Sequence, residues 1–188
     1  MATESCEHAR PQGRAYRWIA IVLVLLIHSG CGYSLAGRGS FLPAYIRTIG
    51  IPTFSNATPV FDLDRQITDR VRSEFIGRGK YAIVPSSTGV DALLTGVIGS
   101  VTLTPTALNQ NQQATRYALI LTVSAEFKDM HTNKVLWANP VMQYREEFTL
   151  DPTSAVDTTT FLAQNVNAQE RMASELARAL VSAILEAF

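Results

Sequence analysis

The chain has few of the residues on which metal and nucleophilic sites depend. Its 188 residues include two cysteines and three histidines, and Cys6, His8 and His28 all lie before residue 31. Only Cys31 and His131 remain after them, which is too few for a zinc ligand set. A Ser-His-Asp triad would rest entirely on His131, which lies in an expected turn. The sequence therefore predicts no metal, no cofactor and no enzyme activity.

The chain also lacks a surplus of charge and a long apolar run. Sixteen Lys and Arg balance sixteen Asp and Glu, whereas proteins that bind nucleic acid usually carry a basic excess. The hydrophobic share of 47% excludes a disordered chain. No apolar stretch reaches the roughly 20 residues that a membrane-spanning helix needs. These absences favour one globular domain that binds no nucleic acid.

The first thirty residues have the pattern of an export signal. Arg10, Arg14 and Arg17 precede an unbroken apolar run at residues 18–27. A basic start followed by a short apolar run and small residues is typical of a secretory signal peptide. We therefore assign residues 1–30 to a signal peptide and exclude them from the fold.

A lipidation motif follows the apolar run. Ser29 and Gly30 precede Cys31, which resembles the lipobox of bacterial lipoproteins, although His28 stands where an apolar residue is usual. An exported chain with one cysteine can form no internal disulfide, and lipidation of Cys31 would remove its exposed thiol. Gly32, in place of Asp, resembles the outer-membrane class. We expect a lipid anchor at Cys31, a flexible tether over residues 31–43 and one domain over residues 31–188.

The first part of the domain predicts a strand, a helix and a strand. Residues 45–51 are β-branched and aromatic, and residues 81–84 are similar. Between them, Leu63, Ile67, Val71 and Phe75 recur every four residues, so residues 63–75 form the core of an amphipathic helix. We expect this helix to begin with a cap at Thr58 and to end at Gly77 and Gly79.

The rest of the domain predicts a β-hairpin region and a final helix. Apolar residues recur at odd positions in residues 93–103 and 117–127, so we expect the odd positions of both strands to face the core. A turn at residues 129–133 leads to residues 135–137 and 141–148, as two strands or one bent strand. Residues 160–188 have a helical apolar period.

The predicted fold class is α+β, with the order β-α-β-β-β(-β)-α. The four or five strands should form a mostly antiparallel sheet. Two helices cannot easily cover both faces of such a sheet, so we expect them on one face, the one that includes Leu119, Leu121, Val123 and Phe127.

Five amide side chains stand in a row between the two long strands, at Asn109, Gln110, Asn111, Gln112 and Gln113. Such residues are common in solvated hairpin turns. Binding residues are also common on loops that a rigid sheet positions, so a partner contact is the second interpretation. The sequence leaves both open.

Four segments together resemble the LptE family of lipopolysaccharide-assembly lipoproteins. They are the opening at residues 31–37 (CGYSLAG), the strand exit at 49–58 (IGIPTFSNAT), the helix end at 75–81 (FIGRGKY) and the third strand at 91–96 (DALLTG). Each motif alone is weak, and their order and spacing carry the resemblance.

The resemblance implies a plug inside the lumen of an LptD β-barrel that helps the barrel fold and helps deliver lipopolysaccharide to the outer leaflet. The expected location is the periplasmic side of the outer membrane. Family members contact lipopolysaccharide through basic residues near the sheet's tip, and Arg116, Lys128 and Lys134 are the candidates here by charge and expected location. The amide residues 109–113 are the candidates for partner contact.

Two other classes of protein remain open. A structural lipoprotein of a secretion or curli-type pore shares the hairpin pattern around residues 127–137, and it would form a symmetric homo-oligomer. A lipid-anchored hydrolase would need a serine and a carboxylate beside His131.

If Cys31 carries the anchor, Cys31→Ala should remove the diacylglycerol mass from the mature N-terminus. Mass spectrometry of the mature protein measures this directly. Cys6→Ala is the matched control and should leave the lipid in place, because Cys6 lies in the expected signal peptide. An intact lipid mass on the Cys31→Ala protein would contradict the assignment.

Overall fold

The computed structural model describes residues 42–79, 81–150 and 157–188. The expected signal peptide 1–30, Cys31 and most of the expected tether lie outside these residues. Leu42 and Pro43 lie inside them, and Leu42 is buried at 3% exposure while its N–H donates to the Tyr81 hydroxyl. The last two residues assigned to the tether are therefore part of the folded domain.

The sheet contains three long strands and three short ones. The long strands are β4 (Ala92–Leu108), β5 (Ala114–Asp129) and β6 (Val135–Thr149), which pair antiparallel in that order. The strands β1 (Thr48–Gly50) and β3 (Ala82–Val84) extend the sheet in parallel beside β4, in the order β3-β1-β4-β5-β6, and β2 (Ser55–Asn56) also pairs with β4. The sheet is mixed and has six strands among the described residues, where four or five were expected, and its long pairings are antiparallel as expected.

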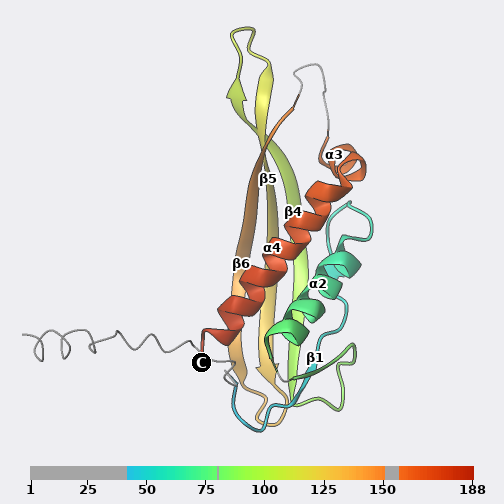
Figure 1. The fold of residues 1–188 in the computed structure, drawn as a ribbon, viewed down its shortest axis with the longest axis vertical. Helices are drawn as coiled ribbons and strands as arrows, with labels where there is room; N and C mark the ends of the chain where they lie inside the picture. Colours follow the sequence, from blue (N-terminus) through green and yellow to red (C-terminus); the bar gives the residue numbers. More distant parts are fainter. Residues whose placement is uncertain (1–41, 80, 151–156) are drawn as a thin grey trace, which may run out of the picture. The chain divides into compact units, whose positions relative to one another are not determined.

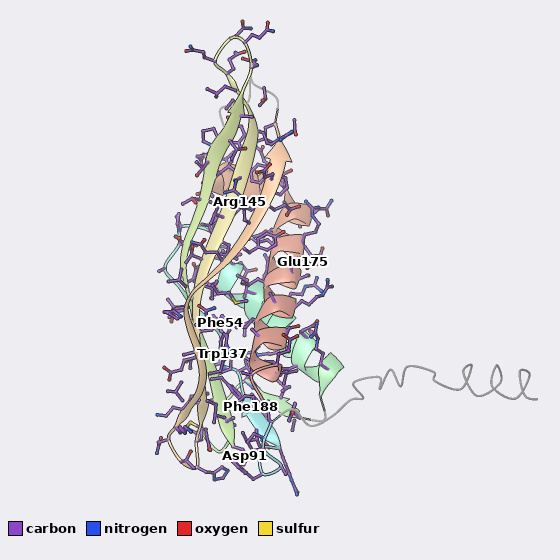
Figure 2. All side chains as sticks on the ribbon, turned by 90° about the vertical axis from the view of Figure 1, so that its left-hand side faces the viewer. Phe54, Asp91, Trp137, Arg145, Glu175 and Phe188 are labelled. Carbon is purple, nitrogen blue, oxygen red and sulfur yellow. The ribbon has the colours of Figure 1, made fainter. Side chains whose placement is uncertain are left out.

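Three helices cover one face of this sheet. They are α2 (Leu63–Arg78), α3 (Thr158–Gln164) and α4 (Val166–Leu185), and α2 packs beside α4. Figure 1 shows α2 and α4 crossing in front of the strands, and the rotated view in Figure 2 shows both on the same side of the sheet. The predicted α+β class with helices on one face is confirmed. We call the helix side the inner face and the opposite side the outer face.

The central strand β5 follows the expected period. Leu119, Leu121, Val123 and Phe127 are each fully buried in the core, as are Met172, Leu180 and Ile184 of α4. Because successive side chains of a strand point to opposite faces, the residues between them lie on the outer face. The helices therefore pack on the face that the sequence predicted.

In β4 the prediction is only half right. Leu94 and Ile98, at even positions, are fully buried, whereas Val97 is 43% exposed on the outer face. An irregularity in the pairing between Ile98 and Ser100 shifts the register, so that Val101 is the next residue to be buried. An extra residue in one strand turns the following side chains to the other face. Odd positions face the core only after this bulge.

The segment before α2 also differs from the prediction, because Thr58 does not cap the helix. The Asn56 side chain accepts from the Thr58 N–H and donates to the Val60 carbonyl. This side-chain turn holds residues 56–60 outside the helix, which begins at Leu63 after Asp62. Gly77 lies within the helix, and Gly79 alone follows its end.

The single long helix expected over residues 160–188 is wrong, since α3 and α4 are separate. Asp157 caps α3 by accepting from the N–H groups of Thr159 and Thr160. Asn165 leaves helical geometry, and its side chain donates to the Phe161 carbonyl. The break allows the buried residues of both helices to reach the same core.

The alternative of one bent strand is confirmed for β6. Its pairing with β5 is interrupted between Val123 and Ala125, opposite Asn139 and Met142. Pro140 lies in this interruption, where a missing N–H costs little because regular pairing is already broken.

Leu121→Ala should lower the free energy of unfolding by about 2–5 kcal/mol, through lost transfer energy and a cavity in a core that has little room to relax. Urea denaturation measures the change. Thr102→Ala on the exposed outer face is the control, with an expected cost below about 1 kcal/mol. A urea midpoint for Leu121→Ala equal to that of the control would contradict the placement of the helices.

Candidate interaction surfaces

The turn between β4 and β5 is built by Asn109. Its backbone pairs with Gln113, and its side-chain oxygen accepts from the N–H groups of Asn111 and Gln113. Gln112 takes a positive φ of 59°, which completes the turn. We call residues 109–113 the amide loop. In Figure 1 the loop stands at the end of a hairpin that extends beyond the helices.

The side chains of the amide loop divide into two groups. Asn109 and Gln113 bond to each other through their side chains, with 3.1 Å between Nδ2 and Oε1. Gln110, Asn111 and Gln112 are exposed. No described residue bonds to their side-chain amides. The loop thus has a backbone held by Asn109 and three amides that face solvent.

Arg116 lies near the base of this hairpin, on the outer face. Its guanidinium is 3.9 Å from the Glu147 carboxylate, and the Arg145 guanidinium is 3.2 Å from the same carboxylate. All three side chains are about half exposed. Exposed ion pairs of this kind contribute little to stability, so the two guanidinium groups can exchange Glu147 for another anion.

Lys128 and Lys134 lie at the opposite end of the sheet. Lys128 pairs with Leu93 on β4 and Val135 on β6, and Lys134 belongs to the β5–β6 turn. Figure 1 shows this turn at the far end of the strands from the amide loop. The structure therefore does not bring Lys128 and Lys134 together with Arg116 in one site.

The same end of the sheet contains a cluster of polar side chains, which we call the terminal cluster: Tyr45, Asp91, Asp129, His131 and Thr132. The Tyr45 hydroxyl donates to Asp129 at 2.7 Å, and Thr132 donates to the same carboxylate at 2.8 Å. The His131 ring lies 2.9 Å from Asp91, and Asp91 accepts from the N–H groups of Arg47 and Thr48. These bonds connect the β5–β6 turn to the entry of β1 and the start of β4.

The hydrogen bonds of the terminal cluster stabilise the charged carboxylates. The Tyr45 hydroxyl is the main cause that lowers the pKa of Asp129 to about 2. The Arg47 N–H, followed by the His131 ring and the Thr48 N–H, lowers the pKa of Asp91 to about 2. Hydrogen bonds to a carboxylate favour its ionised form, so both groups stay charged until strongly acidic pH.

His131 does not form a hydrolase triad in the described residues. Its ring contacts Asp91 and lies edge-on to Tyr45, with 5.9 Å between ring centroids. A carboxylate is present, but no described serine bonds to the ring. The arrangement holds a turn in place.

Among the described residues, no helix lies on the outer face of the sheet. Uncharged polar side chains on this face are Thr95, Ser100, Thr102, Thr104, Thr122, Ser124 and Gln143. A hollow of about 420 Å³ lies where the interrupted pairing of β6 meets β5 and β4, between Val97, Ala138 and Pro140. This face offers hydrogen-bond donors and acceptors over several strands.

Several residues of these sites were not foreseen from the sequence, Arg145 and Asp91 among them. Arg145 lies beside Glu147 and Arg116 because of the β5–β6 register, which sequence periodicity does not determine. Asp91 precedes β4 and was noted only as part of a family motif. An Asp before a strand is a common turn residue, so nothing in the sequence set it apart.

The described residues also lack two other kinds of feature, a metal-binding cluster and a membrane-spanning helix. No three His, Cys, Asp or Glu side chains among them are placed to hold a metal ion. No helix in the same ranges combines the length and hydropathy that a membrane span needs.

The architecture is that of an α+β protein with an open polar sheet face. The family model for LptE, described as lipopolysaccharide-assembly, matches residues 46–184, which is most of the chain. The chain therefore belongs to the LptE family, and the resemblance noted in its motifs is confirmed. A search of curated protein sequences finds no significant match.

Several solved structures are similar in part. The rare lipoprotein B from Shewanella oneidensis is 17% identical, with a TM-score of 0.47 over 74% of this chain and 98% of that one. Lipoprotein GNA1162 from Neisseria meningitidis is 15% identical, with a TM-score of 0.43 over 65% and 94%. The hypothetical protein CT253 from Chlamydia trachomatis is 11% identical, with a TM-score of 0.49 over 74% and 96%.

The terminal cluster predicts a loss of stability in acid. A carboxylate with a lowered pKa in the folded state stabilises the fold above its unfolded pKa of about 3.9 and loses this effect as the pH falls toward 2. Thermal melting of the unmodified protein should therefore show a falling midpoint between about pH 4 and 2.

Asp129→Asn removes this charge and should melt at a lower temperature at pH 7. The difference in melting temperature between this variant and the unmodified protein should shrink as the pH falls toward 2. The Asp129 carboxyl of the unmodified protein then becomes protonated and, like the amide of the variant, carries no charge. Asp64→Asn on α2, outside the cluster, is the control. A constant difference between Asp129→Asn and the unmodified protein from pH 7 to 2 would contradict the assignment.

Proposed function

We propose that this chain is a lipid-anchored plug of an LptD-like outer-membrane β-barrel, which it helps to assemble and with which it delivers lipopolysaccharide to the outer leaflet. The process, lipopolysaccharide assembly, is inferred from the family to which the chain belongs. The observation that carries the proposal is the open outer face, where Thr and Ser side chains lie in place of a second helix layer.

This face suits the interior of a large barrel. Barrel interiors are polar and hydrated, so a plug gains more from hydrogen bonds than from apolar contact. Each such bond adds roughly 0.5–1.5 kcal/mol, and bridging waters extend the set. The near-neutral chain, with 16 basic and 16 acidic residues, adds no strong repulsion against a lumen of either sign.

The amide loop is the proposed contact at the tip of the plug. Asn109 holds the backbone, so the exposed amides of Gln110, Asn111 and Gln112 are presented on an ordered turn. A preorganised loop loses less conformational entropy on binding than a flexible one. Of the two interpretations of these residues, the proposal takes partner contact.

Arg116 is the proposed contact for the anionic phosphates of lipopolysaccharide. Its partner Glu147 is 3.9 Å away, and Arg145 on the adjacent strand adds a second guanidinium to the same patch. Guanidinium groups bind phosphate oxygens with two parallel hydrogen bonds. Lys128 and Lys134, at the other end of the sheet, would meet lipopolysaccharide only at a separate site.

Anchoring completes the proposal. A lipid on Cys31 would hold the domain at the membrane, and Gly32 in place of Asp favours the outer membrane, with the domain on its periplasmic side. A single acyl chain binds membranes only marginally, so stable anchoring requires the several chains that a lipoprotein carries.

Replacing the amide loop by Asn-Gly should weaken capture of the barrel without unfolding the domain. Leu108 pairs with Ala114, so a two-residue turn can join the strands directly. Co-purification of the barrel from detergent-solubilised outer membranes measures capture, and thermal melting measures the fold.

A second variant separates the side chains from the loop itself. Changing Gln110→Ala, Asn111→Ala and Gln112→Gly together keeps Asn109 and the loop length, and it should reduce capture as much as the short turn. Full capture by both variants, with normal melting, would mean that the amide loop is an ordinary solvated turn.

Arg116→Glu should impair lipopolysaccharide binding more than barrel capture, because it opposes an anionic phosphate at the outer face. Binding of purified lipopolysaccharide and co-purification of the barrel measure the two effects. Lys134→Glu, with the same charge change at the far end of the sheet, is the control. Equal lipopolysaccharide binding by Arg116→Glu and the unmodified protein would contradict the assignment.

A further inference from the structure

The two long edges of the sheet differ in how well they are closed. Beyond Ile98, β4 has no neighbouring strand on its outer side among the described residues. The Leu103 N–H on this edge donates to the Thr158 hydroxyl at the start of α3. The odd residues of this stretch direct their backbone N–H and C=O groups away from β5. The next such residue after Leu103 is Pro105, which has no N–H to donate to another strand. These features discourage pairing with another strand.

Over residues 143–149, the edge of β6 pairs with no further strand among the described residues. The Leu150 N–H donates to the Thr115 carbonyl, so Leu150 and the even residues before it direct their backbone groups toward β5. The odd residues therefore direct N–H and C=O away from the sheet: Gln143, Arg145, Glu147 and Thr149. Figure 2 looks onto this edge, with Arg145 labelled, and shows no helix in front of it.

The open stretch has a definite lower limit. The Val141 N–H is taken by the side-chain oxygen of Asn139 at 3.0 Å, and Pro140 has no N–H. Regular pairing with β5 begins at Met142 and continues to Thr149. The available edge is thus the flat segment 143–149, whose midpoint is Glu146.

The outer-face charges of this segment complement their own copy. Arg145 and Glu147 have opposite sign and are exposed on the same face. If two copies pair antiparallel about Glu146, Arg145 of each lies opposite Glu147 of the other, and Gln143 lies opposite Thr149. All four positions direct their backbone groups outward, so each forms a hydrogen-bonded pair in this register.

On the inner face Glu146 would meet its own copy. Each of these carboxylates is already held by Arg171 at 3.1 Å and by the Tyr144 hydroxyl at 2.7 Å, which offsets the like-charge contact.

We infer that segment 143–149 of β6 binds the same segment of a second copy of this chain, forming a two-fold dimer with one continuous sheet. The axis runs through Glu146 perpendicular to the sheet, so both helix layers lie on the same side. The interface is isologous and closes at two copies. A seven-residue strand pair buries less surface than a standard protein interface of about 1,600 Å², so the dimer should dissociate on dilution.

The dimer is a state of the chain outside the barrel, because the plug proposed above places one copy in the lumen and uses Arg145 for lipopolysaccharide. Its test needs neither barrel nor lipopolysaccharide, so the two proposals can fail separately. A strand of the barrel is the other candidate for this edge. Self-complementarity favours the second copy. Arg145 and Glu147 already pair within one copy, and an antiparallel second copy of the same segment places a further opposite charge across from each of them.

The test uses the full mature protein in detergent and measures mass by sedimentation velocity across a concentration series. The unmodified protein should pass from monomer to dimer, and the transition should move to higher concentration at high salt. Glu147→Arg and Arg145→Glu each place like charges opposite one another and should weaken the dimer roughly tenfold or more.

Mixing the two variants supplies the decisive measurement. Each position then faces an opposite charge again, so the mixture should form a heterodimer as stable as the original dimer. Gln143→Pro, which removes an outward N–H and leaves the charges, should also weaken self-association. Arg178→Glu on α4 is the control for charge and should dimerise normally, and all variants should melt like the unmodified protein.

Four results would overturn the inference. They are an unmodified protein that stays monomeric at every concentration, single variants that dimerise normally, a mixture that stays monomeric, and assembly beyond the dimer. A monomeric protein whose edge variants lose barrel capture would assign the edge to the barrel strand.

Discussion

The packing of α2 and α4 against β5 is the constraint on which the rest of the structure depends. The inner residues of β5 are fully buried, and α4 lays its own apolar row over them. Burial of a large apolar side chain contributes about 1.5–3 kcal/mol, so this contact outweighs any single polar interaction in the domain. Because every described helix lies on one face, the other face is left without a helix layer, and the proposed partner surfaces lie there.

Irregularities in the strands decide what each surface presents. The shift near Gly99 turns β4 so that Val101 lies inside, as Leu94 and Ile98 do before it. The interruption at Asn139 and Pro140 bends β6 and leaves no free N–H on its edge at residues 140 and 141. Bulges of this kind re-aim side chains at the cost of local pairing. They also separate the closed and open parts of the sheet edge.

The polar clusters have different roles at the two ends of the sheet. At one end, Asp91 and Asp129 satisfy their charges internally and hold the β5–β6 turn to the start of β1 and β4. At the other end, Arg116, Arg145 and Glu147 stay half exposed and form only weak pairs. Charges that are satisfied internally stabilise the fold, whereas exposed ones remain available to a partner or a ligand.

The sequence alone determined the fold class, the apolar face of β5, the α2 core and the family, because these follow from periods of two and four residues and from motif order. Tertiary structure decided the rest. The bulge in β4 is a shift in cross-strand register, and the Asx turn at Asn56 and the helix break at Asn165 involve local side-chain hydrogen bonds; periodicity predicts neither. Cross-strand register placed Arg145 beside Arg116 and sent Lys128 and Lys134 to the far end, since pairing between strands depends on contacts distant in sequence.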